Sequence, residues 1–143
     1  MSPTNIIIDS SVVIKWYLPD EHDDKALKIK SDFADGNILI AVPVLFFYEV
    51  NNILRTTTKS FRIVKEDSLK AYQNLLELNF IIYSSKELFN AALEEALILD
   101  ITSYDASYIV LSQYLQIPFY TADGKLITKA QSEQVKSLEE YPS

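Results

Sequence analysis

The sequence predicts an α/β fold in which a central parallel sheet is covered by helices on both faces. Short apolar runs typical of buried strands alternate along the chain with segments of helical periodicity. Strands joined through helices form parallel sheets, because each crossover helix packs on a face of the sheet. The 143 residues, 48% of them apolar, have the length and composition of one compact domain spanning 1–143.

The N-terminal part begins with one strand and two helices. Three isoleucines in a row predict a short buried strand that ends at Asp9. Apolar residues then recur at helical spacing until Pro19, which ends the first helix. They recur again until Gly36, a residue suited to terminate the second helix. The predicted ranges are a strand over 5–9 and helices over 12–17 and 24–34.

The middle of the chain repeats this order. A continuous apolar run predicts a second strand, and Pro43 is suited to the first turn of the helix that follows. The threonine-rich stretch 56–59 weakens the helical pattern, and 61–64 is a predicted connection. The predicted ranges are a strand over 38–42, a helix from Pro43 through Arg55, and a helix over 65–78.

The C-terminal part contains three further predicted strands and two helices. The sequence of residues 84–87 fits a capping box that opens a helix. Thr102 or Ser103 can cap the next helix, and residues 122–124 begin another turn into a helix. The predicted ranges are strands over 80–83, 117–120 and 135–138, and helices over 84–99 and 104–115.

Composition narrows the classes of function. The formal charge is −7, so no general attraction to nucleic acid is expected, although cations bound by acidic side chains would supply positive charge locally. The absence of cysteine excludes disulfides and thiolate metal sites and favours a reducing, cytoplasmic location. The apolar runs are too short or too interrupted to span a bilayer, and the N-terminus does not resemble a signal peptide, so no membrane association is expected.

Four carboxylates are placed where α/β folds bind ligands. Asp9 ends the first strand, and Asp123 lies just beyond the strand over 117–120. Asp105 falls in the first turn of its helix, where the helix dipole favours an anion, and Glu49 lies about two turns into the helix after the second strand. Ligands bind at the carboxyl edge of such sheets, near a switch in strand order, so we expect these four side chains to gather there.

Each carboxylate taken alone also has a structural explanation. Asp9 could cap a helix, and Asp105 is a favourable first-turn acid. Glu49 could reach out to solvent, and Asp123 with Gly124 could form an ordinary turn. Gathered at one edge, however, four anions would repel one another strongly unless cations lay between them. The cluster therefore predicts a metal site more strongly than its members do.

The ligand types indicate which metal such a site would hold. Oxygen ligands without cysteine favour Mg²⁺ or Mn²⁺, and magnesium held by carboxylates commonly acts on phosphate esters. The only histidine, His22, lies in a charged loop and is expected at the surface. Catalysis by a histidine–serine pair and a multi-histidine zinc site are therefore disfavoured.

Four motifs around these acids occur in a recognisable order. They are DSSVVIKWYLPDE from Asp9, YEVNNIL from Tyr48, TSYDASY from Thr102 and YTAD from Tyr120. Together they resemble the PIN-domain family and, within it, the VapC-type toxins of prokaryotic toxin–antitoxin pairs. The similarity extends over nearly the whole chain, from about residue 6 to residue 141.

The resemblance implies a three-layer α/β/α sandwich with a central parallel sheet. It also implies an Mg²⁺- or Mn²⁺-dependent endoribonuclease that hydrolyses RNA phosphodiester bonds with a metal-activated water. The residues that match the family's catalytic, metal-binding acids are Asp9, Glu49, Asp105 and Asp123. The residues that match its neighbouring polar positions, with expected roles in orienting ligands or substrate, are Ser10, Asn52 and Thr121. A cap explains Ser10 and a turn explains Thr121 equally well.

The resemblance further implies protein partners. A cognate antitoxin would bind the chain and inhibit it, and a homodimer is expected. The aromatic run 46–48 and the apolar side of the helix over 65–78 are candidates to line a groove or a dimer contact, although ordinary core packing explains most of these residues as well. The candidates to line a path for RNA phosphates are Lys15, Arg55, Lys59, Arg62 and Lys65.

Three other functions use some of the same residue types. A phosphatase of the haloacid-dehalogenase type would use Asp9 as a nucleophile, but it requires a second acid two residues on, where serines and valines follow instead. A response-regulator receiver requires paired acids at the end of the first strand, and Asp9 stands alone there. The remaining alternative is a catalytically silent PIN-like module that binds RNA or protein.

Overall fold

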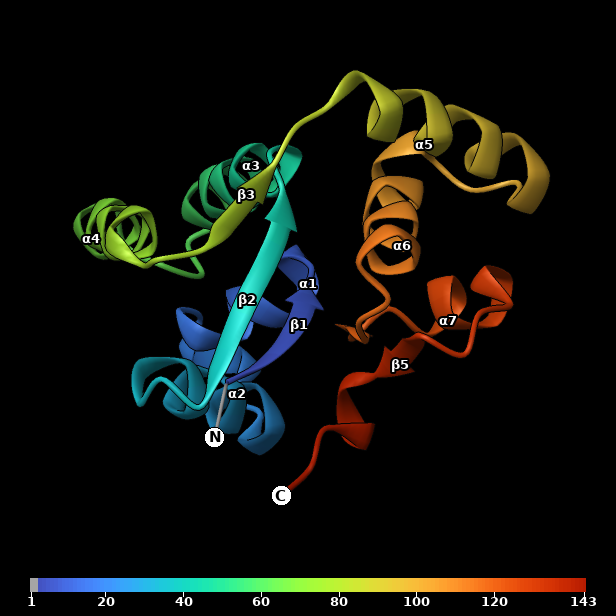
Figure 1. Ribbon diagram of the computed structural model, residues 1–143. Helices are drawn as coiled ribbons and strands as arrows, with labels where there is room; N and C mark the ends of the chain where they lie inside the picture. The colour runs from blue at the N-terminus through green and yellow to red at the C-terminus, as the bar shows by residue number, and fades with distance from the viewer. Residues whose placement is uncertain (1–2) are drawn as a thin grey trace.

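The computed structural model describes residues 3–143, which contain five strands in one sheet (Figure 1). The strand order is β3-β2-β1-β4-β5, and every neighbouring pair is parallel. The strands are β1 (Thr4–Ile8), β2 (Ile38–Pro43), β3 (Ile81–Tyr83), β4 (Phe119–Thr121) and β5 (Val135–Ser137). The predicted α/β fold with a central parallel sheet is confirmed.

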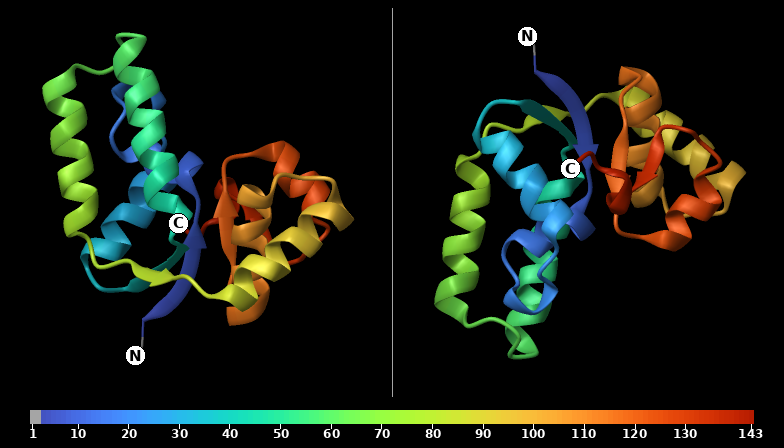
Figure 2. Two further views of the ribbon diagram at one scale, coloured as in Figure 1. Left: turned by 90° about the horizontal axis from the view of Figure 1, so that it is seen from above. Right: turned by 90° about the horizontal axis from the view of Figure 1, so that it is seen from below.

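Helices cover both faces of this sheet, as two views from opposite sides show (Figure 2). Those of the first half lie on one side: α1 (Ser10–Val13), α2 (Asp24–Ala34), α3 (Leu45–Lys59) and α4 (Lys65–Glu77). Those of the second half lie on the other: α5 (Lys86–Leu99), α6 (Ser103–Leu115) and α7 (Gly124–Ala130). Short 3-10 turns occupy Ile14–Trp16, Pro19–Glu21 and Leu138–Glu140.

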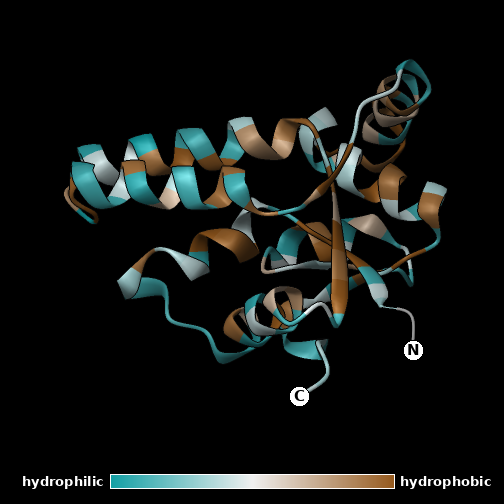
Figure 3. Ribbon diagram, turned by 60° about the vertical axis from the view of Figure 1, so that its left-hand side comes forward, coloured by the Kyte–Doolittle hydropathy of each residue, from teal (hydrophilic) through white to brown (hydrophobic). Residues whose placement is uncertain are grey.

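The core explains why the central strands are apolar without alternation. Ile7 and Ile8 of β1 are fully buried on opposite faces of the sheet. Ile40 and Val42 of β2 are also fully buried, and both point to one face. Figure 3 shows the apolar residues gathered along the strands and the inward sides of the helices. Helix α5 packs chiefly on α6 through small side chains, so it lies farther from the sheet.

The sheet also defines a switch in strand order at β1. The chain passes from β1 to β2 on one side, and later places β4 on the other side. Residues that follow β1 and β4 therefore meet at the carboxyl edge beside the switch point. The register pairs Ile7 with Phe119 and Ile8 with Tyr120, which brings Asp9 next to Thr121.

Two expected features of the third helix are wrong. Pro43 does not open this helix but ends β2, where it pairs with Tyr83 of β3, and the helix begins at Leu45. The helix also does not weaken over 56–59, since α3 continues to Lys59. The hydroxyl of Thr57, which is buried, donates to the backbone carbonyls of Ile53 and Leu54, so this threonine is accommodated inside the helix.

Smaller differences concern the ends of elements. The helix expected over 12–17 is a short α-helix followed by a 3-10 turn. The cap of α5 is Ser85, whose side chain accepts a hydrogen bond from the Leu88 N–H, so the expected start is displaced by one residue. Thr102 rather than Ser103 caps α6. Over residues 3–143, no helix combines the length and apolar character needed to cross a membrane.

Candidate active site

Asp9 lies at the switch point and is held from two sides. The Thr121 hydroxyl donates to its Oδ2 at 2.6 Å, and the Ser11 hydroxyl and N–H donate to its Oδ1 at 2.5 and 3.1 Å. Asp9 thus does cap α1, but its side chain is also buried, with a relative exposure of 6%. Burial, together with the charge of Asp105, raises the pKa of Asp9 to about 6 against the opposing effect of these hydrogen bonds.

Glu49 lies in the second turn of α3 and is half-buried. The hydroxyl of Tyr108, on α6, donates to its Oε1 at 2.6 Å. Tyr108 is itself buried and stacks on Phe119 of β4, so the position of this hydroxyl is fixed by the core. Burial raises the pKa of Glu49, and the charges of Asp9 and Asp105 act in the same direction.

Asp105 and Asp123 complete the acidic edge. Asp105 lies in the first turn of α6, where Thr102 caps the helix by accepting the Asp105 N–H. Burial raises the pKa of Asp105, and the charge of Asp123 adds to this effect. Asp123 is exposed and caps α7, since its Oδ1 accepts from the N–H groups of Lys125 and Leu126.

The fold therefore brings the four predicted acids to the same edge of the sheet, linked by charge. Asp105 is the centre of this group, because its charge raises the pKa of Asp9 and of Glu49, and the charge of Asp123 raises the pKa of Asp105 in turn. The side chains do not converge on one point: within residues 3–143, no three Asp, Glu or His side chains are grouped closely enough to hold an ion. Charge coupling extends beyond ligating distance, so both observations are consistent.

The three polar residues expected beside the acids differ in placement. Thr121 is fully buried and contacts Asp9 directly. Asn52 is exposed on α3, one turn after Glu49. Ser10 opens α1, and no hydrogen bond of its side chain is found among residues 3–143. The hydroxyl that contacts Asp9 belongs to Ser11 instead.

Two residues of this site were not identified from the sequence. Ser11 donates to Asp9, lies 3.3 Å from the Thr121 hydroxyl and accepts the N–H of Ala122, so it joins the ends of β1 and β4. Its position two residues after a capping aspartate was an available signal. Tyr108 follows Asp105 by one helical turn, so both lie on one side of α6, but only the packed structure places Tyr108 against Glu49.

The donor set fits a divalent cation in its chemistry. All four side chains offer carboxylate oxygens, which Mg²⁺ and Mn²⁺ prefer. Asp9, Glu49 and Asp105 each have a raised pKa, partly because of the negative charge of another acid in the group. A bound cation would remove that repulsion. Asp9, Glu49, Asp105 and Asp123 are therefore the residues that would hold such an ion.

Comparisons with known proteins identify the type of domain. The family model of the PIN domain matches residues 6–131. Among solved structures, the chain is similar to the crystal structure of PAE2754 from Pyrobaculum aerophilum, with a TM-score of 0.70 and 21% sequence identity. The alignment covers 96% of this chain and 92% of that one, and at this identity the likeness shows a shared fold. No curated protein matches the sequence.

Proposed function

This chain belongs to the PIN-domain family, and from that premise we propose that it is an Mg²⁺- or Mn²⁺-dependent endoribonuclease acting as the toxin of a VapC-type toxin–antitoxin pair. PIN domains are in general nucleases, and hence hydrolases of phosphodiester bonds. The observation that carries the proposal is the buried, hydrogen-bonded Asp9 at the switch point, coupled by charge to acids from α3 and α6.

The residues of the site have distinct parts in this proposal. A bound cation would polarise a phosphoryl oxygen and lower the pKa of a water molecule. Thr121 and Ser11 hold both oxygens of Asp9 in place, and Tyr108 holds one oxygen of Glu49. Carboxylate side chains fixed in this way lose little conformational freedom when they bind a cation. Asp123 is the most exposed of the four acids.

Replacing Asp105 by asparagine tests this function. We expect Asp105→Asn to lower cleavage of a labelled single-stranded RNA more than about 100-fold, because it removes the charge at the centre of the acidic group. Chelator should abolish cleavage by the wild-type chain, and Mg²⁺ or Mn²⁺ should restore it. The products should carry 5′-phosphate and 3′-hydroxyl ends, and single-stranded DNA of the same sequence serves as the substrate control.

Asp35→Asn is the matched control for this variant. Asp35 is exposed at the end of α2, and its side chain takes no part in the acidic edge. Cleavage that survives both Asp105→Asn and chelator would overturn the metal-dependent mechanism. A wild-type chain that binds RNA without cutting it would favour the silent binding module, a candidate supported by the lack of convergence among the acids of residues 3–143.

The proposed toxin role adds two protein partners, a cognate antitoxin and a second copy of the chain. Phe46 and Leu75, two candidates for a contact surface, are core residues, whereas Tyr48 and Leu69 are exposed. A further apolar row stands on the outer side of α5, formed by exposed side chains of Phe89, Leu93 and Leu97. Unpartnered apolar rows of this kind support a protein contact.

Mass measurement of the purified chain tests both partners. We expect a dimer in solution, and a larger complex when the product of the adjacent gene is present. Leu93→Glu and Leu97→Glu should shift the isolated chain to monomer, because they place charge on the apolar row of α5 without touching the core. Glu94→Gln, on another side of the same helix, is the control. A wild-type chain that stays monomeric at high concentration would rule out the homodimer.

A further inference from the structure

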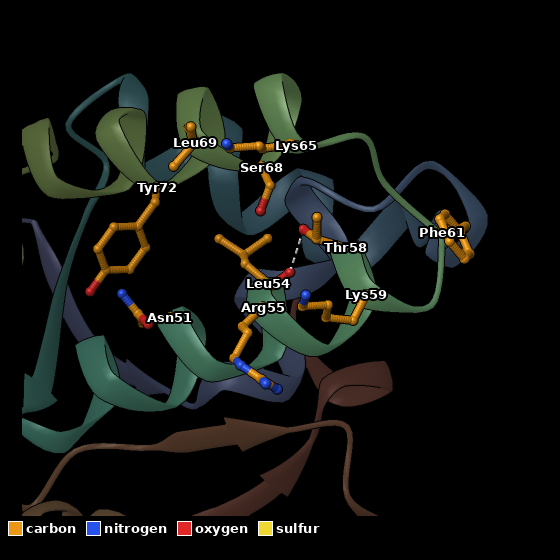
Figure 4. A pocket seen from close by; sticks show the side chains of 10 residues that line it. All are labelled: Asn51, Leu54, Arg55, Thr58, Lys59, Phe61, Lys65, Ser68, Leu69 and Tyr72. Carbon is orange, nitrogen blue, oxygen red and sulfur yellow. Dashed lines mark hydrogen bonds between the residues drawn. The ribbon is translucent and has the colours of Figure 1, made fainter.

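A cavity of about 610 Å³ lies between α3 and α4, and none of the four carboxylates of the acidic edge lines it (Figure 4). Its walls include Leu54 from α3 and Leu69 and Tyr72 from α4, so they are largely apolar. Figure 4 shows Asn51 pointing toward Tyr72 at one end of the cavity and Phe61 at the other, at the tip of the helical hairpin.

Three cations border this cavity: Arg55, Lys59 and Lys65. In the described part of the chain none of the three forms an ion pair, whereas Arg62 pairs with Asp20 and Glu21. Unpaired cations around an apolar cavity are therefore complementary to a ligand that is both anionic and apolar.

Helix α3 connects this cavity to the acidic edge. It carries Glu49 in its second turn, then Arg55 about 9 Å and Lys59 about 15 Å farther along its axis, turned about 120° and about 80° around the helix from Glu49. Figure 4 shows Arg55 and Lys59 next to each other on α3, beneath the cavity. A nucleic-acid strand with its scissile phosphate near Glu49 would meet these cations if it continued along α3 and around it. An acidic peptide would match the cations but has no reason to continue to the acids.

Phe61 offers an exposed aromatic face at the end of this path. Its side chain is 94% exposed, and its backbone has a φ of +63°, a conformation that bulky residues rarely adopt. The turn is fixed by hydrogen bonds from the N–H groups of Phe61 and Arg62 to the carbonyls of Thr58 and Thr57. An aromatic ring presented to solvent by a hydrogen-bonded turn is suited to stack on a base.

We infer that the cavity between α3 and α4 is a nucleotide subsite that binds bases of the RNA strand beside the cleavage point. This inference rests on the proposed function and names how its substrate is held. One base lies among Leu54, Leu69 and Tyr72, with the Asn51 amide at its edge. A base farther along the strand stacks on Phe61, and Arg55, Lys59 and Lys65 bind phosphates of the intervening backbone.

Binding of two probes separates contacts to bases from contacts to phosphates. The probes are a fluorescent oligouridine and the same oligomer without bases, bound to the non-cleaving Asp105→Asn chain. We expect Phe61→Asn to weaken oligouridine binding about tenfold and to leave the base-free oligomer unchanged. Asparagine tolerates the left-handed backbone, so the turn should persist, and Phe61→Tyr should retain binding.

The cations should affect both probes alike. We expect Arg55→Gln and Lys59→Gln each to weaken both probes about fivefold, and to reduce the slope of log K against log salt by about 0.7 each. Lys86→Gln is the control, since Lys86 is exposed at the start of α5, far from the cavity in sequence and lining none of it. Unchanged melting temperatures would show that these variants remain folded.

Three outcomes would overturn the subsite. The first is equal binding of both probes by the Asp105→Asn chain with no change in the cavity. The second is cavity variants that bind both probes as the Lys86→Gln chain does. The third is a glutamate- and leucine-rich peptide that binds the cavity without displacing RNA. Cleavage by the wild-type chain is scored separately. If the wild-type chain cuts RNA but the cavity variants bind normally, only the subsite fails. If the base preference is found without cleavage, the subsite stands and the proposed function fails.

Discussion

Asp9→Asn is expected to abolish RNA cleavage and, at neutral pH, to make the metal-free protein more stable. Asp9 is buried, and its pKa is raised from 3.8 to about 6. Keeping the carboxylate charged at pH 7 therefore costs the folded state about 3 kcal/mol. Asparagine retains the shape and the capping oxygen but loses one charge-assisted hydrogen bond, so we expect a net gain of about 1–2 kcal/mol.

The direction of the pKa shift fixes how this gain in stability changes with pH. Because the folded-state pKa of Asp9 lies above the unfolded value, the folded state binds the proton more tightly. The contribution of Asp9 to stability is present below about pH 4 and is lost as the pH rises through about 6. Urea unfolding of both chains in chelator, from pH 4 to pH 8, should show curves that separate across this window. The separation corresponds to about 3–6 °C in melting temperature at neutral pH.

Asp35→Asn serves again as the control, because the exposed Asp35 should change neither stability nor cleavage. A gain in stability that is the same at pH 4 and pH 8 would assign it to something other than the charge of Asp9. An Asp9→Asn chain that is less stable at neutral pH would show that the hydrogen bonds to Ser11 and Thr121 outweigh the burial of the charge. A destabilised active site of this kind is a common cost of function.

Divalent cations are expected to stabilise the wild-type chain strongly at pH 7.5 and weakly at pH 5. An ion that binds only the folded state adds about 2.7 kcal/mol at a concentration 100 times its Kd, which raises the melting temperature by about 5–10 °C. At pH 5 Asp9 is mostly protonated, since its pKa is about 6, and it must release that proton to bind the ion. One bound proton lowers the affinity about tenfold for each pH unit below the pKa.

Thermal melts with MgCl₂, and with NaCl at matched ionic strength, measure this effect. Sodium should have little influence at either pH, which separates specific binding from general screening of the negative charge. Asp9→Asn and Asp105→Asn should each remove most of the response to Mg²⁺. Equal stabilisation at pH 5 and pH 7.5, or an undiminished response in both variants, would show that the ion binds elsewhere on this acidic protein.

Several elements could be predicted because their signals are local. The helix α2 has the predicted bounds, with Asp23 as its cap, and β1, β2 and β4 differ from prediction by one or two residues at their ends. Pro43 was misplaced because a helix start and a strand end accept proline equally well in sequence. The pairing of Pro43 with Tyr83, a contact between distant segments, decides between them.

The sequence alone determined the order of strands and helices, and with it the edge of the sheet at which Asp9, Glu49, Asp105 and Asp123 are expected. Parallel strands joined by helices leave one carboxyl edge, so acids that follow the strands arrive there. Only the tertiary structure decided which side chains hold them. The β1–β4 register sets Thr121 beside Asp9, and the stacking of Tyr108 on Phe119 sets a hydroxyl against Glu49. Such contacts join residues 59 and 112 positions apart, and packing, not local pattern, brings them within hydrogen-bonding distance.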